Sequence, residues 1–471
     1  MYKNRKNHWI GIFHISILCF GLWVTPTIEA DDWPEFLGND KNGSSKERGL
    51  LSQWPQTGPP AIWDISIGSG YGAPSVKKGL LVFHHRRSNQ EIVECLDAIS
   101  GKTIWKQGYP SRFIDPFGYS NGPRCSPILT DKLCYTFGAE GVLSCLQLKD
   151  GSLVWQKKTR ADWTIPNPFF GVGSTPLLRG GKLLVMMGGQ PNSGVVALDP
   201  KTGTTIWESV GKQNWQGQPM TGWRGSRTVA WQNQWKQASF SSLITAEIHG
   251  KPHLIALMRQ GLVSLDPDSG KVNFSRWFRA TVNDSVNGST PVIVDNYIFI
   301  SNAYYNTGSA LLKVNPSGAG FEEIWASRSL ETHWNTPIYH KGYLYAFTGR
   351  QEEQGALRCV QFRTGKLMWE TTGQKQESTS DVQRTRRGFL QREDRFGRGS
   401  CLKVDGKLIL LGERGLLAMA ELNPKQYVEL SRYRHPSLKH PCWAAPIISN
   451  RRLFIRSEGQ LVCLNLASGS N

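Results

Sequence analysis

The chain has 471 residues, a formal net charge of +18 at pH 7 and 39% hydrophobic residues. Its 49 glycines and 25 prolines are too many for a helical protein and favour a turn-rich, all-β one. The length is compatible with two or three average domains or with one large repeat domain. The 18 tryptophans are unusual and require an explanation of their own.

The first 30 residues have the pattern of a secretory signal. Lys3, Arg5 and Lys6 give a positive start, residues 9–24 are mostly apolar, and Ala30 offers a small residue for cleavage. The apolar run is short for a membrane-spanning helix, so we predict a cleaved signal at residues 1–30. We therefore expect an exported protein that is periplasmic or associated with the cell envelope. An uncleaved membrane anchor is the alternative.

The positive charge indicates which partners suit such an exported chain. Basic surfaces adhere to anionic lipid head groups and to acidic polysaccharide, so we expect anionic or polysaccharide ligands, envelope proteins and peripheral membrane contact. A solvated, patchy surface without a specific anionic partner is the alternative. No recognisable nucleic-acid module occurs, so nucleic acid is not expected as a partner. The sequence does not indicate an oligomeric state.

One pattern recurs along the chain after the signal. An opening in which a small residue usually precedes proline, as in Ser126-Pro127 and Thr175-Pro176, is followed by an apolar strand, a second strand ending in Leu-Asp, a Thr-Gly-Lys turn and a tryptophan. Runs such as 80–83, 183–186 and 343–347 are strand-like and too short for helices. A four-stranded unit repeated every 40 to 50 residues or so is typical of a β-propeller. The copies open near residues 73, 126, 175, 241, 290, 336, 400 and 445.

The tryptophan and the glycine of each copy have physical roles. Glycine supplies the positive φ of the tight turn. The tryptophan closes the outermost strand, and we predict that it docks between neighbouring blades and buries a large area. The predicted docking residues are Trp63, Trp105, Trp155, Trp207, Trp325 and Trp369.

The eighth copy lacks an outer strand, and residues 60–63 supply a matching strand before the first copy. The N-terminal strand would complete the last blade and remove exposed sheet edges. We therefore predict one all-β domain over residues 31–471, an eight-bladed propeller of four-stranded antiparallel blades closed by the N-terminal strand. Seven blades, with the degenerate seventh copy displaced, is the alternative. Two insertions interrupt the spacing, one rich in tryptophan at 211–240 and one charged at 371–398.

The positions of the nine cysteines argue against a disulfide framework. Cys95, Cys145, Cys359 and Cys463 occupy the same local frame of four copies, and Ala197 occupies it in another. A position that accepts either cysteine or alanine is a small buried core slot. No pair with metal-ligand spacing is present, and no metal site is predicted.

These motifs resemble a known family. The turn-and-tryptophan segments that end at Trp105, Trp207 and Trp369 are similar to the docking motif of the pyrroloquinoline quinone (PQQ) dehydrogenases. Residues 33–38 resemble the W-P-x-F-x-G lead-in of exported bacterial PQQ-like propellers. The resemblance covers residues 32–466. It implies the propeller fold, and the family holds both enzymes and a non-catalytic branch, the BamB-type assembly lipoprotein that acts as a scaffold.

Chemistry of the PQQ dehydrogenase type requires an acidic base, a calcium ion and often a vicinal disulfide over the quinone. The chain has no Cys-Cys step. Asp115 and Asp284 are the acids near blade openings; each is a candidate base or calcium ligand, with a turn residue as the alternative. No catalytic residue and no cofactor is therefore assigned, and PQQ with Ca²⁺ stays an alternative.

Residues just before each inner strand face the mouth of a propeller channel, where ligands usually bind. Arginine there could hold carboxylates, of which PQQ has three, and the amides and aromatic rings could hold a sugar. A water-filled mouth is the alternative. The predicted funnel residues are Tyr71, Arg124, Gly173, Phe240, Asn287, His333, Asn335, Arg398 and Trp443.

Three functions follow, in order of preference. The first is a non-enzymatic exported propeller that binds or scaffolds at the cell envelope. The second is a PQQ-dependent oxidoreductase acting on an alcohol or a sugar. The third is a polysaccharide-binding protein that uses Trp215 and Trp223 of the tryptophan-rich insertion.

Overall fold

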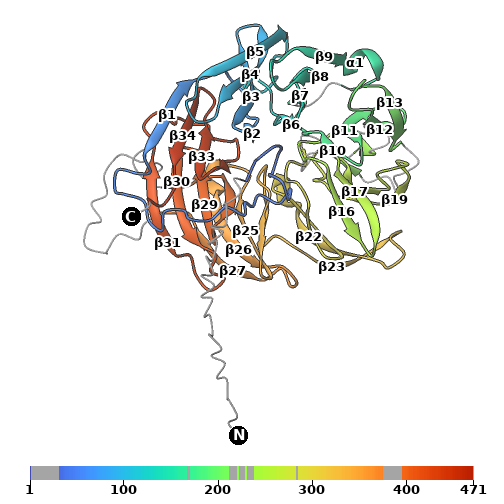
Figure 1. Cartoon of the computed structure of the whole chain (residues 1–471). Coiled ribbons are helices and arrows are strands. Elements are labelled where there is room, and N and C mark those ends of the chain that lie inside the picture. The colour runs from blue at the N-terminus through green and yellow to red at the C-terminus, as the bar shows by residue number, and fades with distance from the viewer. Residues whose placement is uncertain are drawn as a thin grey trace.

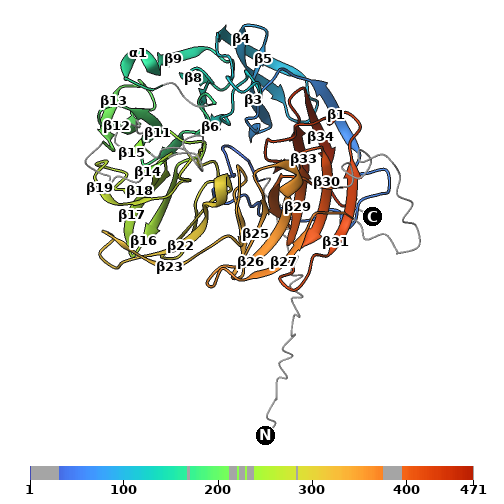
Figure 2. The same cartoon turned by 180° about the vertical axis from the view of Figure 1, so that it is seen from behind.

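The computed structural model describes residues 1, 31–166, 170–211, 220–221, 229–230, 238–282, 285–374 and 395–469. Eight four-stranded antiparallel sheets stand around a central axis (Figures 1 and 2). The prediction of an all-β, eight-bladed propeller is confirmed, and the seven-bladed alternative is wrong because the degenerate seventh copy forms a complete blade. The predicted signal, residues 1–30, lies outside the described residues apart from Met1.

The first four blades run from an inner strand at the channel to an outer strand at the rim. Blade 1 consists of β2 (Ser75–Lys77), β3 (Leu80–Arg87), β4 (Gln90–Asp97) and β5 (Thr103–Pro110). Blade 2 consists of β6 (Ile128–Leu129), β7 (Leu133–Phe137), β8 (Val142–Gln147) and β9 (Leu153–Lys158). Blade 3 consists of β10 (Leu177–Arg179), β11 (Lys182–Gly189), β12 (Ser193–Leu198) and β13 (Thr205–Ser209). Blade 4 consists of β16 (Ile244–Ile248), β17 (Lys251–Leu257), β18 (Gly261–Leu265) and β19 (Val272–Trp277).

The other blades repeat this order, except that the last takes its outer strand from the N-terminal side. Blade 5 consists of β20 (Val292–Val294), β21 (Tyr297–Asn302), β22 (Gly308–Val314) and β23 (Phe321–Ser327). Blade 6 consists of β24 (Ile338–His340), β25 (Tyr343–Thr348), β26 (Ala356–Gln361) and β27 (Leu367–Thr371). Blade 7 consists of β28 (Gly399–Val404), β29 (Lys407–Gly412), β30 (Leu416–Glu421) and β31 (Glu429–Arg434). Blade 8 consists of β32 (Ile447–Ser449), β33 (Arg452–Arg456), β34 (Gln460–Asn465) and β1 (Ala61–Ser66).

Few described elements lie outside the blades. A short helix, α1 (Thr159–Asp162), follows β9, and single 3₁₀ turns occur at Tyr304–Asn306 and Glu352–Gln354. The tryptophan-rich insertion contributes a two-stranded hairpin, β14 (Met220–Thr221) and β15 (Val229–Ala230). The four tryptophans of that insertion lie outside the described residues, as do residues 375–394 of the charged one. Within the described part of the chain, no helix is long and apolar enough to cross a membrane.

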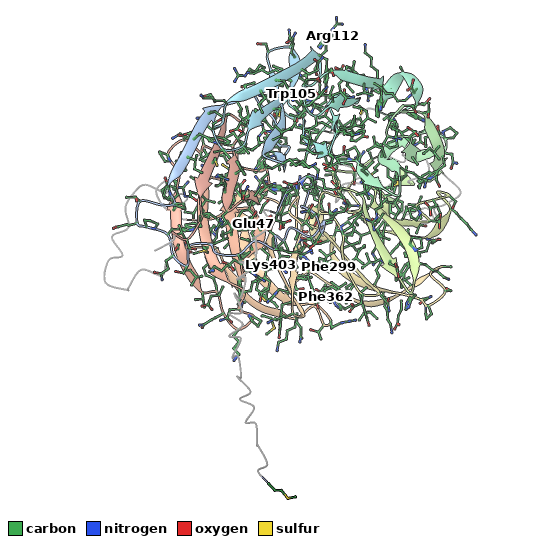
Figure 3. The ribbon with its side chains drawn as sticks, in the orientation of Figure 1. Glu47, Trp105, Arg112, Phe299, Phe362 and Lys403 are labelled. Carbon is green, nitrogen blue, oxygen red and sulfur yellow. The ribbon has the colours of Figure 1, made fainter. Side chains whose placement is uncertain are left out.

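The core lies between the blades rather than within one of them. One buried cluster joins Tyr135 and Leu143 of blade 2 to Leu183 and Val196 of blade 3, and similar clusters fill the other interfaces. Figure 3 shows how densely side chains fill these spaces, with Trp105 in the outer part of its blade. Because each blade buries both faces against its neighbours, its two middle strands are almost continuously buried, as in β11 and β12, while outer strands such as β13 stay partly exposed.

The six predicted tryptophans lie in the outer strands, where each packs against the turn glycine of the next blade or donates to a carbonyl there. Trp105, for example, donates from Nε1 to the carbonyl of Leu148 at 2.9 Å, and its indole lies against Gly151 of blade 2. At the interface between blades 7 and 8 a tyrosine ring takes the place of the indole, since Gly58 lies against Tyr433. The repeat pattern did not reveal this substitution of tyrosine for tryptophan.

The pairing of neighbouring strands explains why cysteine or alanine recurs at one position of the repeat. Cys95, Cys145, Cys359 and Cys463 are each paired across the strands with a docking tryptophan, and Ala197 is paired with Trp207. All four cysteines are buried and free. A small side chain at this position leaves room for the indole ring beside it.

We predict that Gly151→Ala lowers the free energy of unfolding by about 2–4 kcal/mol. An added Cβ would lie 2.4 Å from Cε3 of Trp105, so the indole would have to move, and the backbone φ of +73° disfavours any side chain. Gly79→Ala is the matched control, because its φ is +77° and nothing lies within 4 Å of the added Cβ. Urea denaturation of both variants separates the clash from the backbone strain. Equal losses would contradict the docking role.

A segment before β1 crosses the ring axis on one side. Residues 33–47, here called the crossing segment, form part of the blue trace that runs over the middle of the ring in Figure 1. Trp33 exchanges backbone hydrogen bonds with Val76 of blade 1 at 2.9 and 2.8 Å, and the carbonyl of Pro34 accepts one from Leu129 of blade 2. These contacts attach the start of the segment to the inner strands of the first two blades.

The far end of the crossing segment is attached to blades 7 and 8. Ser45 donates from its backbone N–H to the carbonyl of Lys403 at 2.8 Å, and the carboxylate of Glu47 accepts from the backbone of Asn450 and Arg451. Between these ends, Glu35 and Leu37 line a small cavity together with residues of blades 3, 4 and 5. The segment therefore bridges the ring and closes one end of the channel.

Candidate functional site

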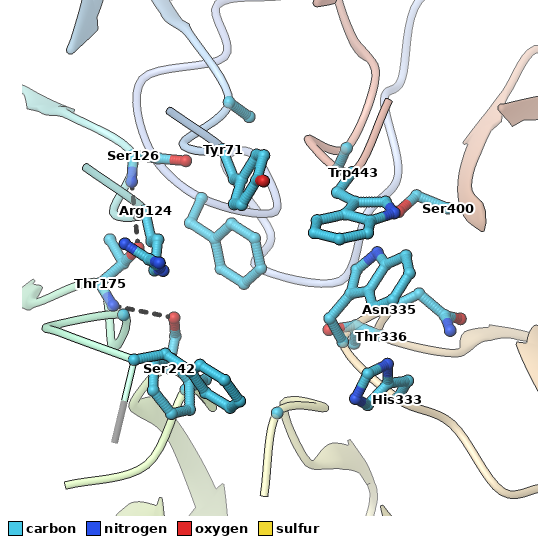
Figure 4. Close-up of a pocket in the computed structure, with 18 of the residues that line it drawn as sticks. Tyr71, Arg124, Ser126, Thr175, Ser242, His333, Asn335, Thr336, Ser400 and Trp443 are labelled. Carbon is cyan, nitrogen blue, oxygen red and sulfur yellow. Dashed lines mark hydrogen bonds between the residues drawn. The ribbon is translucent and has the colours of Figure 1, made fainter. Parts of the chain in front are cut away.

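The closed channel forms a cavity that we call the cup. It is lined by residues of all eight blades, has a volume of about 210 Å³, and has Phe36 and Leu37 of the crossing segment among its lining residues. We divide the side chains of its wall into two sets, called the mouth layer and the deeper layer, and members of both are labelled in Figure 4. The mouth layer includes Tyr71, Arg124, Phe240, His333, Arg398 and Trp443, and the deeper layer includes Ser126, Thr175, Ser242, Thr336 and Ser400.

The deeper layer is built by the hydroxyl residues that open the inner strands, and Ser126, Thr175 and Thr336 are each followed by proline. The hydroxyl of Thr175 accepts the backbone N–H of Ser126 at 3.2 Å, and that of Ser242 accepts the backbone N–H of Thr175 at 3.2 Å (Figure 4). Ser242 continues the series by donating its own N–H to Thr290 at 3.1 Å. A small hydroxyl residue at the start of an inner strand thus joins one blade to the next.

The structure brings most of the predicted funnel residues together. Of the nine, eight line the cup: Tyr71, Arg124, Gly173, Phe240, His333, Asn335, Arg398 and Trp443. Asn287 does not line it. Its side chain is fully buried and donates to the carbonyls of Met258 and Phe278 at 2.8 and 2.9 Å, so it holds the backbone of blade 4 in place.

Asp115 is paired and does not stand free as a base. Its carboxylate forms an ion pair with Arg124, and the Asp115 side chain is fully buried. Asp115 also accepts the backbone N–H of Phe117 at 2.8 Å, so it stabilises its own turn. Among the described residues that line the cup, Asp115 is the one carboxyl group. The other candidate acid, Asp284, lies outside the described residues.

Arg398 is neutralised in the same way. Its guanidinium donates to both oxygens of Glu413 at 2.6 to 3.1 Å, and Trp443 donates from Nε1 to Glu413 at 3.1 Å. The Glu413 side chain is fully buried behind the cup wall. The two arginines that line the cup therefore bring no uncompensated charge to it.

Aromatic rings form a continuous belt around the mouth. Trp443 lies 4.8 Å from Tyr71, 5.3 Å from Trp334 and 5.8 Å from Tyr119, measured between ring centroids. Phe170 extends the belt from Tyr119, at 5.7 Å. Sequence reasoning missed Trp334, Tyr119 and Phe170, although Trp334 lies between two residues that it selected.

Several polar atoms of the cup wall have no hydrogen-bond partner. These are Nδ1 of His333, Nε1 of Trp334 and Oγ1 of Thr336, all from the segment that leads into β24. The Thr336 residue is only 7% exposed. Buried polar groups are normally paired, so this cluster marks a place where a ligand or water supplies the missing partners.

The described residues do not fit PQQ with Ca²⁺. Within the described ranges, no three side chains of histidine, cysteine, aspartate or glutamate lie close enough together to hold a metal ion. The carboxylates of PQQ would meet arginines that are already bound to Asp115 and Glu413. The aromatic belt could stack on a flat ring, but the ligand set for calcium and the free base are missing from the described part of the cup.

We predict that His333 makes the protein less stable in mild acid. Burial, assisted by the charges of Arg398 and Arg350, lowers the pKa of His333 to about 3, although Glu413 acts in the opposite direction. The unfolded histidine takes up a proton below about pH 6.5, while the folded one does not. The free energy of unfolding should therefore fall as the pH falls from 6.5 towards 3.

The variant His333→Asn tests this prediction. The decrease between pH 7 and pH 4 should be smaller in the variant by about 1–3 kcal/mol, as measured by urea denaturation across that range. Parallel pH profiles of the two proteins would contradict it.

The fold and the docking motif define the class of the protein, a propeller of PQQ-type repeats. Residues 48–223 and 88–371 match the family described as "Outer membrane protein assembly factor BamB". The chain belongs to this family. A search of curated proteins found no match.

Solved structures agree on the fold. BamB from Moraxella catarrhalis is similar with a TM-score of 0.55 and 14% identity, covering 88% of this chain and 99% of that one. Quinohemoprotein alcohol dehydrogenase from Comamonas testosteroni is similar with a TM-score of 0.61 and 13% identity, covering 93% and 81%. At such identities the likeness extends to the fold alone, and it includes both an assembly factor and a dehydrogenase.

Proposed function

We propose that the protein is a non-enzymatic binding or scaffold protein of the cell envelope, and that the cup is its ligand-binding site. One observation carries the proposal: both arginines of the cup are paired with buried carboxylates, while the aromatic belt and unpaired hydrogen-bonding atoms are left to meet a ligand. A site of this kind can bind without the free base that an oxidation would need.

Family membership and the N-terminal pattern support the location. The family is described by an outer-membrane assembly factor, and residues 1–30 have the composition of a secretory signal. The proposed partners are envelope proteins and anionic or polysaccharide ligands. With a net charge of +18, peripheral contact with an anionic membrane surface is also part of the proposal, and nucleic acid is not.

The test combines a binding screen with an activity assay on the purified chain. A chemically mixed library of small neutral, anionic and aromatic compounds is screened by thermal shift, with Trp443→Ala as the comparison. We expect at least one compound to raise the Tm of the natural protein and to have a much smaller effect on the variant.

Dye-linked oxidation of small alcohols and aldoses is measured in the same preparation with added PQQ and Ca²⁺. We expect no turnover. Turnover that depends on PQQ would overturn the non-enzymatic proposal, and a library without any binder would argue against the cup as a ligand site.

A further inference from the structure

We infer that the cup binds a neutral saccharide, held between its aromatic belt and its ring of hydroxyl groups; this inference rests on the proposed function. The belt offers flat apolar faces at the mouth, and the deeper layer offers neutral donors and acceptors. A sugar ring has the matching two-sided character, with apolar C–H faces and hydroxyl groups around its edge. The two layers of the cup thus present the two kinds of contact that a sugar needs.

The aromatic side of the cup is open enough to stack on a ring. Trp443, Trp334 and Tyr71 are partly exposed and line the cavity. Arg398 lies over Trp334 and Trp443, at 4.7 and 5.3 Å from their ring centroids, and so holds the two indoles in place. Figure 4 shows Trp443 and Tyr71 facing the cavity from blades 8 and 1. Rings fixed in this way lose little entropy when a ligand stacks on them.

The polar side of the cup has unused hydrogen-bonding capacity. Ser126, Thr336 and Ser400 line the cavity and are each at most 7% exposed, and the hydroxyl group of Thr336 has no hydrogen-bond partner. Nδ1 of His333 and Nε1 of Trp334 are unpaired as well. Sugar hydroxyls both donate and accept, so they can satisfy this mixed set, whereas a purely apolar ligand would leave it unpaired.

The charges of the cup select against an acidic ligand. Arg124 is bound to Asp115 and Arg398 to Glu413, and both carboxylates are fully buried. An acidic sugar would have to break one of these pairs to reach a guanidinium. A neutral sugar leaves both pairs intact, and we therefore assign the neutral class.

The rim extends the aromatic surface beyond the cup. Phe117 and Tyr119 are 51% and 53% exposed, and both contact Phe170 at the mouth. An exposed aromatic group beside a pocket is typical of a binding surface. The rim gives an oligosaccharide further sugar units to contact, so a trisaccharide should bind more tightly than its monosaccharide.

The test uses defined probes with the purified full chain. Maltotriose, cellotriose, mannotriose and chitotriose are titrated by calorimetry and by intrinsic tryptophan fluorescence, together with trigalacturonate as the acidic probe and N-acetyltryptophanamide as the aromatic one. At least one neutral trisaccharide should bind, with a Kd at least tenfold lower than that of its monosaccharide and than those of the other two probes.

Variants locate the binding in the cup. Thr336→Val and Ser400→Ala remove hydroxyl groups with little change in shape, and each should weaken binding by about tenfold at an unchanged Tm. Ser52→Ala is the matched control, because Ser52 is exposed and does not line the cup; it should leave the Kd unchanged. Trp443→Ala should weaken binding more than either hydroxyl variant.

The outcomes separate the two proposals. If trigalacturonate or N-acetyltryptophanamide binds and the cup variants weaken it while no neutral sugar binds, the saccharide inference fails and the cup remains a ligand site. If a neutral sugar binds but the cup variants do not affect it, the inference is also overturned, since the sugar binds elsewhere. If none of these probes binds and the mixed library also gives no binder, both proposals fail.

Discussion

Glu413→Gln is expected to lower the free energy of unfolding by about 3–5 kcal/mol at pH 7. Glu413 is fully buried and receives hydrogen bonds from Arg398 and Trp443, so the neutral amide would leave the Arg398 guanidinium, only 14% exposed, without its counter-charge. Urea denaturation of the two proteins measures the difference. Trp443 and Arg398 would also lose the group that fixes them, so any ligand of the cup should bind more weakly.

The pKa of Glu413 determines how the stability difference between the natural protein and this variant changes with pH. Burial alone would raise the pKa of Glu413, but the nearby His440, 3.7 Å from the carboxylate, and the hydrogen bonds and charge of Arg398 lower it from 4.5 to about 2. A carboxylate with a lowered folded pKa contributes its full stability above the unfolded pKa and loses it as the pH falls through the folded one. The difference between natural protein and variant should therefore shrink between pH 4.5 and 2.

An exposed ion pair supplies the control. Glu370 forms a pair with Arg358 on the outer strand of blade 6, where the Glu370 side chain is 42% exposed. Glu370→Gln should cost less than about 1 kcal/mol, because water screens the pair. If both substitutions cost the same, burial of the Glu413 pair would not be the reason for its importance.

The fold could be predicted from the repeats because each copy places the same kinds of residue at the same strand and turn positions. Trp105 and Gly151 occur at fixed offsets in their copies, so the eight copies predict eight blades even where one is degenerate. The seventh blade differs in sequence because Tyr433 packs against Gly58 in place of a tryptophan. The position equivalent to the docking tryptophan is held by Ser431, which pairs with Met419, and Tyr433 lies two residues further along the strand, so the repeat offset did not point to it.

The crossing segment could not be predicted in the same way. Its partners are distant in sequence, as the backbone hydrogen bond between Ser45 and Lys403 illustrates, and no repeat fixes such a contact. The sequence predicted where the cup lies but not how its charged side chains are paired. Nothing in the sequence showed that Arg398 would be bound to Glu413, and Asn287 has the right offset from its strand but turns into the protein instead.

The largest effect is expected from removing the strand that closes the ring. In Figure 1 the blue β1 lies along the red β34, and their register pairs Trp63 with Cys463 and Ile65 with Leu461. Trp63 also packs against Gly101 of blade 1. A chain without residues 31–66 would expose the edge of β34 and the cluster of buried residues between blades 8 and 1. We expect it to show no cooperative thermal unfolding and to aggregate.

A permuted chain separates the closing strand from the crossing segment. The backbone N–H of Asn465, at the end of β34, donates to Pro60 at 2.8 Å, so residues 58–66 can follow residue 469 and form the same outer strand from the other terminus. This chain lacks residues 31–57. If closure of blade 8 is what folds the ring, the permuted chain should regain a cooperative transition at a lower Tm, with one end of its channel open. If it stays unfolded, residues 31–57 are themselves required, because they supply both the bonds of the crossing segment to blades 1, 2, 7 and 8 and the buried side chains of Leu50 and Trp54.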